Sequence, residues 1–208
     1  VACMVTHVVV DKNDSSFSKP TKPIGSFYSE EEAVRLRKER KWVMEKDPSG
    51  KGYRRVVPSP IPIDIVEKNS IKNLIKNKTI VVASGGGGVP VVKGDALVGV
   101  QAVVDKDLAS SILAKVVGAN YFLILTNINN AYLNFKKENE KPIGKITLEE
   151  IEKYYKEGHF PPGSMGPKIL AAMEFIRNGG EKVVICSLEN AKEAFEEKTG
   201  TIIVKNQK

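Results

Sequence analysis

The sequence is poor in the residues that build disulfide frameworks and zinc sites. It has two cysteines and two histidines in 208 residues, and no pair of them has the spacing of zinc ligands. Because Cys3 and Cys186 both lie in apolar, strand-like runs, we expect them to be buried free thiols. A zinc site is therefore not expected, and the small number of cysteines favours a reducing, cytoplasmic setting.

Long hydrophobic runs are also absent. No apolar run approaches the ~18 residues that a membrane-spanning helix requires. The first residues, VACMVTHVVVD, lack the basic and then apolar segments of a signal peptide. They open directly on a strand-like run at Val1, so we expect that an N-terminal section is missing from this sequence. No membrane partner is predicted.

Aromatic residues make up only 7% of the chain and show no stripe on which nucleic-acid bases would stack. The formal net charge of +7 is the one feature that favours a nucleic-acid-binding domain. The lysines, however, are spread among acidic residues, as on solvated helix faces. We therefore predict no nucleic-acid partner, a prediction that salt-dependent retention of duplex DNA would contradict. Positive charge also suits a site for anionic phosphates.

What is present is an alternation of strand-like and helix-like segments. The run YFLILT is apolar on both faces, as a central parallel strand is, and Thr147 with Glu150 forms a capping box. The expected strands are 5–10, 79–84, 121–126, 182–188 and an edge strand at 200–204, and the expected helices are 69–77, 105–117, 147–158, 167–178 and 188–197. This order predicts an α/β fold, a three-layer αβα sandwich around a mainly parallel sheet.

Residues 11–60 have a different character from the alternating part. They contain a charged helix at 29–40 with Ser29 as its N-cap, then a DPSGKG turn and the strand RRVVPSP. Prolines at 58, 60 and 62 mark the return to the main body. The pattern predicts a small, self-contained α+β insertion.

Four consecutive glycines, Gly85, Gly86, Gly87 and Gly88, directly follow a strand-like run. Such a run costs backbone entropy, and free N–H groups in it form a concavity that binds anions. Ligands of α/β sheets bind at the carboxyl ends of strands, which favours a phosphate site over a merely flexible turn. The spacing excludes a Walker A loop and a dinucleotide-binding fingerprint.

Three lysines lie in segments that suit phosphate binding. Lys106 stands between Asp105 and Asp107 at a strand–helix junction, where Asp107 is either part of a phosphate and metal-organising cluster or only a helix cap. Lys168 lies on the first turn of a helix, where the helix dipole disfavours a positive charge, so a bound phosphate is the better explanation for it. Lys22 lies on a loop stiffened by prolines. Without further context, we would interpret it as a solvated surface lysine. The residues that lead into the helix of Lys168 are Gly163, Ser164, Met165 and Gly166.

In this order, the segments KPTKPIG, RRVVPSP, ASGGGGVPV, AVVDKDLAS and EGHFPPGSMGPK resemble those of the carbamate kinases, in the amino-acid kinase superfamily. The resemblance runs through almost the whole chain. It implies reversible phosphoryl transfer between carbamoyl phosphate and ADP, giving carbamate and ATP, with Mg²⁺ as cofactor, in arginine fermentation. It also implies a homodimer. The implied domains are 1–10 as the end of an N-terminal lobe, 11–60 as a protruding substrate lid, and 61–208 as a nucleotide-binding lobe.

The resemblance also implies roles for individual residues. Lys106 and Lys168 would contact the transferring phosphoryl group and the nucleotide phosphates, with Asp107 organising both lysines, and Lys22 would reach over the substrate. The substrate pocket would be lined by Gly85, Gly86, Gly87 and Gly88, and further nucleotide contacts would come from Thr126, Tyr132, Met165 and Gly166. No protein side chain is assigned to the metal.

Two departures keep other interpretations open. Carbamate kinases carry an N-terminal section with a GGN-type turn, another lysine and part of the substrate pocket, which this sequence lacks. Asn127 stands where relatives often have aspartate, in a Thr-Asp-Val segment near the nucleotide. The alternatives are a non-catalytic nucleotide- or phosphate-binding protein of the same fold, and a sibling such as acetylglutamate kinase or glutamate 5-kinase. The segments KPTKPIG and RRVVPSP argue against the sibling.

Overall fold

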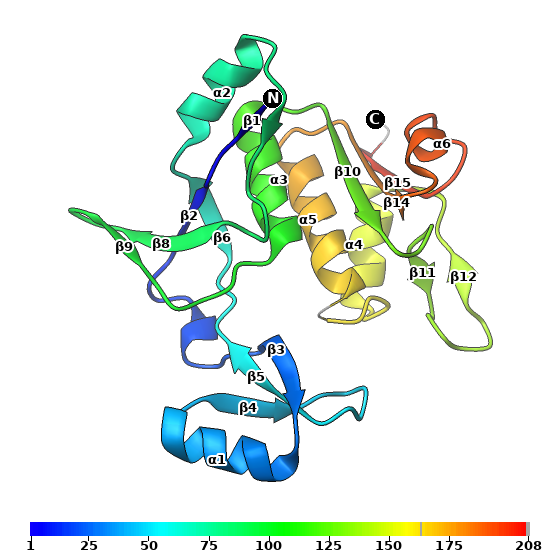
Figure 1. Ribbon diagram of the computed structural model, residues 1–208. Coiled ribbons are helices and arrows are strands. Elements are labelled where there is room, and N and C mark those ends of the chain that lie inside the picture. The colour runs from blue at the N-terminus through cyan, green and yellow to red at the C-terminus, as the bar shows by residue number, and fades with distance from the viewer. Residues whose placement is uncertain (163, 207–208) are drawn as a thin grey trace.

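Two groups of strands share one layer of helices in the computed structural model, which describes residues 1–162 and 164–206 (Figure 1). One group has the order β10-β14-β15-β13 and the other the order β6-β2-β8-β9. Within them β10 and β14, β13 and β15, and β2 and β8 run parallel. These strands are β2 (His7–Val10), β6 (Pro62–Ile65), β8 (Val89–Lys93), β9 (Leu97–Gly99), β10 (Tyr121–Thr126), β13 (Lys145–Thr147), β14 (Lys182–Ser187) and β15 (Thr201–Val204).

Further short strands form two-stranded pairs beside these groups. β1 (Ala2–Cys3) runs parallel to β7 (Val81–Val82), and β11 (Tyr132–Leu133) runs antiparallel to β12 (Lys141–Pro142). The helices of the main body are η1 (Ser15–Phe17), α2 (Lys68–Lys76), α3 (Lys106–Val117), α4 (Leu148–Lys156), α5 (Met165–Arg177) and α6 (Ala191–Phe195). In the described part of the chain, no helix is both long and apolar enough to cross a membrane.

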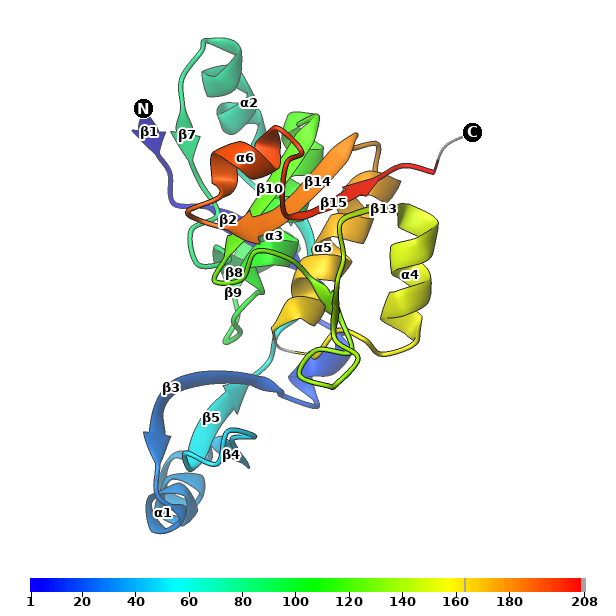
Figure 2. The same cartoon turned by 90° about the vertical axis from the view of Figure 1, so that its right-hand side faces the viewer.

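Strand β14 of the C-terminal sheet is covered on both faces, in keeping with the layered α/β fold. Val183 and Ile185 of β14 point into the main core with α5, whereas Val184 and Cys186 pack with Ala194 of α6. This alternation follows from the two-residue period of a strand. Figure 2 shows α6 across the sheet from α5.

Local sequence signals place the starts of several helices. Thr147 and Glu150 form the expected capping box at α4, and Ser29 forms another with Glu32. Each box satisfies backbone N–H groups that have no partner within the helix. Gly118 ends α3 in the left-handed conformation. The helix starts predicted at Ser29 and Thr147 are confirmed.

A separate three-stranded sheet and one helix hang below the main body in Figure 1. The antiparallel order is β3-β5-β4, from β3 (Lys22–Tyr28), β4 (Val43–Lys46) and β5 (Tyr53–Val57), and α1 (Glu30–Arg40) packs on it. We call 22–57 the protruding subdomain. Its core, formed by Ala33, Leu36 and Met44, is separate from the other cores. Phe17, by contrast, packs against the main body. The domain limits of 11–60 stay a prediction.

Two strand predictions are corrected by the structure. Segment 200–204 is not an edge strand, because β15 lies between β14 and β13. The residues Thr201, Ile202 and Ile203 are buried there, as an interior strand requires. The partner β13 was not expected, because its three residues precede α4 without a strand-like apolar run.

The expected central strand at 121–126 is only partly buried. β10 ends its four-stranded sheet, and Tyr121 and Leu125 are 48% and 40% exposed. Val5 is 74% exposed and lies before the start of β2, and Cys3 is exposed although it was expected to be buried. Cys186 is buried, and both thiols are free. The apolar patterns are correct, but the described strands and helices leave these side chains partly open to solvent.

Candidate active site

Asp105 caps the N-terminus of α3. Its Oδ1 accepts hydrogen bonds from the backbone N–H groups of Asp107, at 2.9 Å, and Leu108, at 3.4 Å. The helix dipole favours a negative charge at this end. The sequence left open whether Asp107 is only a cap, and the structure assigns that task to Asp105.

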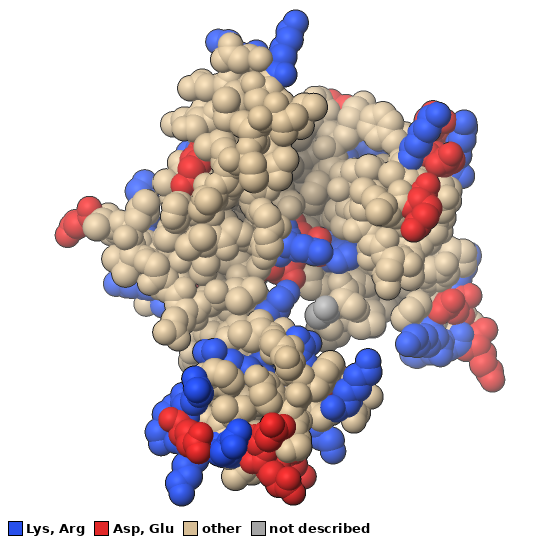
Figure 3. Space-filling model, in the orientation of Figure 1, with Lys and Arg blue, Asp and Glu red and all other residues tan. Residues whose placement is uncertain are grey.

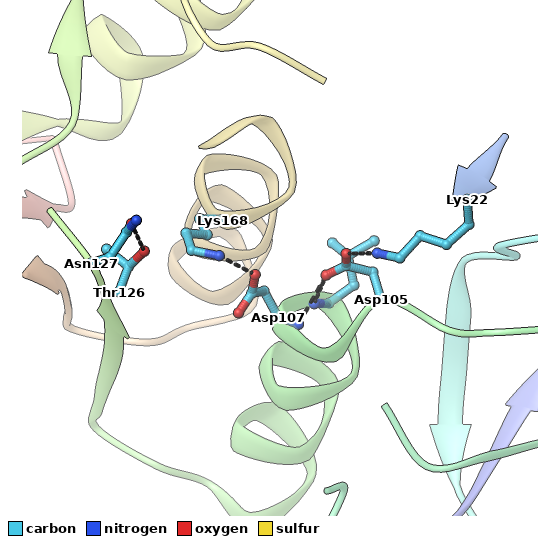
Figure 4. Close-up of polar contacts among 7 residues, drawn as sticks. Lys22, Asp105, Asp107, Thr126, Asn127 and Lys168 are labelled. Atoms are coloured by element: carbon cyan, nitrogen blue, oxygen red, sulfur yellow. Dashed lines mark hydrogen bonds and ion pairs between the residues drawn. The ribbon is translucent and has the colours of Figure 1, made fainter. Parts of the chain in front are cut away.

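Asp107 holds Lys168 across the gap between α3 and α5. The distance from Lys168 Nζ to Asp107 Oδ2 is 2.8 Å, and both side chains are largely shielded from solvent (Figure 4). Lys168 lies in the first turn of α5, where the dipole repels a positive charge. The carboxylate of Asp107 compensates for this, so a bound phosphate is no longer needed to explain the position of Lys168.

Asp105 makes a second contact, to the protruding subdomain. Lys22 Nζ lies 2.6 Å from Asp105 Oδ2, between residues 83 positions apart in the sequence. Burial raises the pKa of Asp105, but Lys22 and the α3 amides outweigh it, so the pKa stays below its ordinary value. The carboxylate is therefore ionised at neutral pH.

The glycine loop approaches this cluster with one of its four glycines. Gly86 lines the cleft, whereas Gly87 and Gly88 have φ angles of +114° and +77°. Gly87 packs closely on the backbone of Val104, and Gly88 on the side chain of Val8 and the carbonyl of Thr6. Gly87 bonds back to the carbonyl of Ser84, closing the turn. These two glycines shape the loop. Among the residues that the structure describes, none beyond the immediate chain neighbours has an atom within 4 Å of where a Cβ on Gly85 would stand.

A cleft of about 240 Å³ brings the predicted lysines together. Blue and red side chains gather in a hollow at the centre of Figure 3. Its three lysines and two aspartates leave one net positive charge, which suits an anion. Its lining is Lys22, Gly86, Val103, Val104, Asp105, Lys106, Asp107, Ser164 and Lys168.

A larger and more apolar hollow of about 420 Å³ adjoins this cleft, and Ser164 and Lys168 line both. Four of the predicted nucleotide contacts, Thr126, Tyr132, Met165 and Lys168, line it. Its lining is Thr126, Asn127, Ile128, Tyr132, Phe135, Lys136, Phe160, Pro161, Ser164, Met165 and Lys168. An aromatic hollow that opens on a cationic cleft has the form of a site for a base carrying phosphates.

The structure thus brings most of the predicted site residues to one place. Lys22, Lys106, Asp107 and Lys168 share the cleft, and Thr126, Tyr132 and Met165 line the hollow. Gly166 is buried, and a Cβ on it would stand 3.0 Å from the carbonyl oxygen of Pro161. Gly163 lies outside the described residues.

Sequence reasoning missed part of the site, including the second contact of Asp105 and the side chains of Phe135 and Lys136. Asp105 carried the signal of an N-cap, but nothing local showed that it also holds Lys22. Phe135 and Lys136 lie in the segment between β11 and β12 and line the apolar hollow. That segment has no helix-like or strand-like pattern of apolar residues, so its sequence does not predict that it lines a hollow together with α5.

Known proteins match this chain along nearly its whole length. The family model "Amino acid kinase family" matches residues 23–187. A carbamate kinase of Thermococcus kodakarensis is 53% identical over 206 residues, and one of Pyrococcus furiosus is 52% identical over 205. The two alignments cover 99% and 98% of this chain, and this chain spans 65% of the length of each relative.

Solved structures share the fold. A carbamate kinase from Giardia lamblia bound to AMP-PNP has a TM-score of 0.88 and 45% identity, with 98% of this chain and 65% of that chain covered. A structure from Aeropyrum pernix K1 has a TM-score of 0.90 and 44% identity, with 99% and 67% covered. Together with the family match over residues 23–187, these likenesses show that the chain belongs to the amino acid kinase family.

Proposed function

We propose that the protein containing this chain transfers a phosphoryl group reversibly between carbamoyl phosphate and ADP. One observation carries the proposal. Lys22, Lys106 and Lys168 come from three separate segments and line one cleft beside the glycine loop. Relatives about 50% identical are carbamate kinases, which supports this substrate over that of a sibling kinase.

The nucleotide would lie in the apolar hollow. Its base would contact aromatic and apolar side chains such as Phe135, Phe160 and Met165, and its phosphates would point toward Ser164 and Lys168, where the hollow meets the cleft. The similar enzyme from Giardia lamblia has been solved with AMP-PNP, a finding in keeping with a nucleotide site.

The chemistry asks mainly for positioning and charge neutralisation. A β-phosphate oxygen of ADP attacks the phosphorus of carbamoyl phosphate, the bond from phosphorus to the carbamate oxygen breaks, and carbamate leaves with that electron pair. Lys106 and Lys168 would offset the negative charge on the equatorial oxygens. Asp107 would keep the Lys168 ammonium at its place, and Lys22 would bind the carbamoyl phosphate end.

Magnesium fits this arrangement as a companion of the nucleotide. In the described part of the chain, no three His, Cys, Asp or Glu side chains come together as a metal site. Asp105 and Asp107 each hold a lysine. Mg²⁺ is commonly bound through nucleotide phosphates with few protein ligands, and when bound it would neutralise phosphate charge.

The proposal extends to the setting that the family resemblance implies. The reaction would generate ATP during arginine fermentation in the cytoplasm, and the enzyme would act as a homodimer. The net charge on the cleft favours anionic substrates in either direction of the reaction.

The test is ATP formation from carbamoyl phosphate and MgADP by the intact gene product that contains these residues. We expect Lys106→Ala and Lys168→Ala to lower kcat by roughly 10²-fold or more, as loss of a group that stabilises transition-state charge does. Lys115→Ala is the matched control, because Lys115 lies exposed in the last turn of the same helix α3.

Two results would contradict the proposal. Normal kcat in both variants would remove the lysines from the reaction. Tight calorimetric binding of MgADP without turnover of either carbamoyl phosphate or acetylglutamate would indicate a non-catalytic binding protein instead.

A further inference from the structure

We propose that Asp105 is a positioning residue that fixes the ammonium of Lys22 at the mouth of the cleft and thereby ties the protruding subdomain to the start of α3. The part of this inference that concerns substrate rests on the proposed function. It goes beyond the roles that the sequence suggested, because those assigned the organisation of the lysines to Asp107.

Asp105 uses its two carboxylate oxygens for two different tasks. Oδ1 accepts the helix amides of Asp107 and Leu108, and these bonds fix the plane of the carboxylate. Oδ2 is thereby aimed at Lys22, whose Nζ it meets at 2.6 Å (Figure 4). The helix cap thus orients the ion pair.

The ion pair is well shielded for a contact between two separate parts of a molecule. The exposed fraction of the side chain is 11% for Asp105 and 29% for Lys22. Charged hydrogen bonds are stronger than neutral ones, more so when shielded from water. A lysine ammonium has three donors, so the bond to Asp105 leaves two for an anion in the cleft that Lys22 lines.

This pair is the single ion pair that joins segment 11–60 to the rest of the chain within residues 1–162 and 164–206. The neighbouring ties are two hydrogen bonds at the base, from the backbone N–H of Val103 to the carbonyl of Pro58 and from the backbone N–H of Ile61 to the carboxylate of Asp14. These two hydrogen bonds hold the segments that connect the subdomain to the main body. Asp105 fixes the position of Lys22, the first residue of β3. Without it, Lys22 would explore many rotamers and bind substrate with a larger entropy cost.

The test compares Asp105→Asn and Asp105→Ser with the wild type in the intact gene product. Both replacements keep a good N-cap, so the melting temperature should stay close to that of the wild type. Both lose the charge that holds Lys22. We expect KM for carbamoyl phosphate to rise about tenfold, with KM for ADP within about twofold, as loss of one charge-assisted contact predicts.

A double-mutant comparison asks whether Asp105 acts through Lys22. We expect Lys22→Ala with Asp105→Asn to be no worse than Lys22→Ala alone, since the two residues serve one contact. Asp64→Asn is the matched control. It also removes one aspartate–lysine pair, with Lys68, away from the cleft, and should leave both KM values unchanged.

A second measurement does not depend on turnover. Tryptic cleavage within 22–57 should be faster in Asp105→Asn than in the wild type and in Asp64→Asn. If the wild type has no kinase activity but this difference is seen, the tie stands and the proposed function falls. If the wild type is active and Asp105→Asn changes neither KM for carbamoyl phosphate nor the cleavage rate, the inference is wrong.

Discussion

Asp105 and Asp107 are both aspartates at the start of α3, but their carboxylates contact different lysines. Asp105 is the extended N-cap, so its side chain turns back over the helix end toward Lys22. Asp107 is already helical and points across to Lys168. Two short carboxylates at one helix start can therefore place two lysines that come from opposite sides of the cleft.

Ser84, just before the glycine loop, has an unfavourable backbone conformation and, among the described residues, an unpaired hydroxyl. It has a left-handed backbone, with a φ of 59°, and it is 2% exposed. Its hydroxyl oxygen has no hydrogen-bond partner in the part of the chain that the structure describes. A non-glycine residue in this conformation costs about 1–3 kcal/mol, and an unpaired buried hydroxyl adds to that cost.

We expect Ser84→Gly to raise the free energy of unfolding by about 1 kcal/mol, because glycine adopts this backbone without strain. Urea unfolding of the intact gene product measures it. Ser84→Ala removes the hydroxyl but keeps the backbone strain, so it should stabilise less. Equal stabilisation by alanine and glycine would show that the hydroxyl, not the backbone, carries the cost.

The glycine loop as an element depends on backbone shape at one position in particular. At Gly87, φ is +114°, and an added Cβ would stand 2.3 Å from the carbonyl oxygen of Val104. That oxygen belongs to the backbone just before α3, which cannot give way without moving Asp105. The loop and the start of α3 are therefore packed as one unit.

Gly87→Ala should lower the free energy of unfolding by about 3 kcal/mol or more, from the overlap and the strained φ together. Gly85→Ala is the control. Its φ is not in the left-handed region, and none of the described residues beyond its chain neighbours lies within 4 Å of the added Cβ, so it should cost less than about 0.5 kcal/mol. Chemical denaturation compares the two, and a mild effect at Gly87 would mean that α3 can shift.

At the surface of the C-terminal sheet, one carboxylate forms ion pairs with lysines from two strands. Glu197, in the turn after α6, lies 2.8 Å from Lys145 of β13 and 2.9 Å from Lys182 of β14. These two contacts lower the pKa of Glu197 to about 2. The side chain is 36% exposed, so solvent screening limits the stabilisation to less than about 1 kcal/mol.

A lowered pKa in the folded state has a definite pH signature. The contribution of Glu197 is present above its ordinary pKa of 4.5 and is lost as the pH falls from there toward 2. We expect Glu197→Gln to be less stable than the wild type at pH 7, with the difference shrinking as the pH falls through this range. Denaturation curves at several pH values test it, and a difference that is constant with pH would contradict it.

The whole molecule consists of a main body and a subdomain with its own small core. Lys22 pairs with Val57 across the two strands at the base, so the chain leaves and returns at neighbouring positions. Antiparallel partners lie about 5 Å apart and can be joined by a two-residue turn. The subdomain can therefore be removed without stretching the main body.

We expect replacement of residues 23–56 by two glycines to leave the melting temperature of the remainder within a few degrees. Calorimetric MgADP affinity should also persist, because the apolar hollow lies wholly in the main body. If the proposed function holds, turnover of carbamoyl phosphate should fall by about 10²-fold or more, since Lys22 would lose its rigid support. Unfolding of the remainder would instead show that the main body depends on the subdomain.

Local sequence was sufficient for much of the fold, and its motifs named the lysines that the structure brings into one cleft. The N-cap at Ser29 and the capping box at Thr147 predicted helix starts, because a cap satisfies backbone groups of its own helix. Lys22, Lys106 and Lys168 were found through motifs, whose order along the chain resembles one family.

Which side chains meet across the chain was decided by packing. The pairing of Asp105 with Lys22, the interior place of β15 and the exposure of Cys3 all depend on which elements lie side by side. Local propensity acts within a few residues along the chain. Contacts between residues 61 or 83 positions apart arise only when helices and sheets bury their apolar faces against one another.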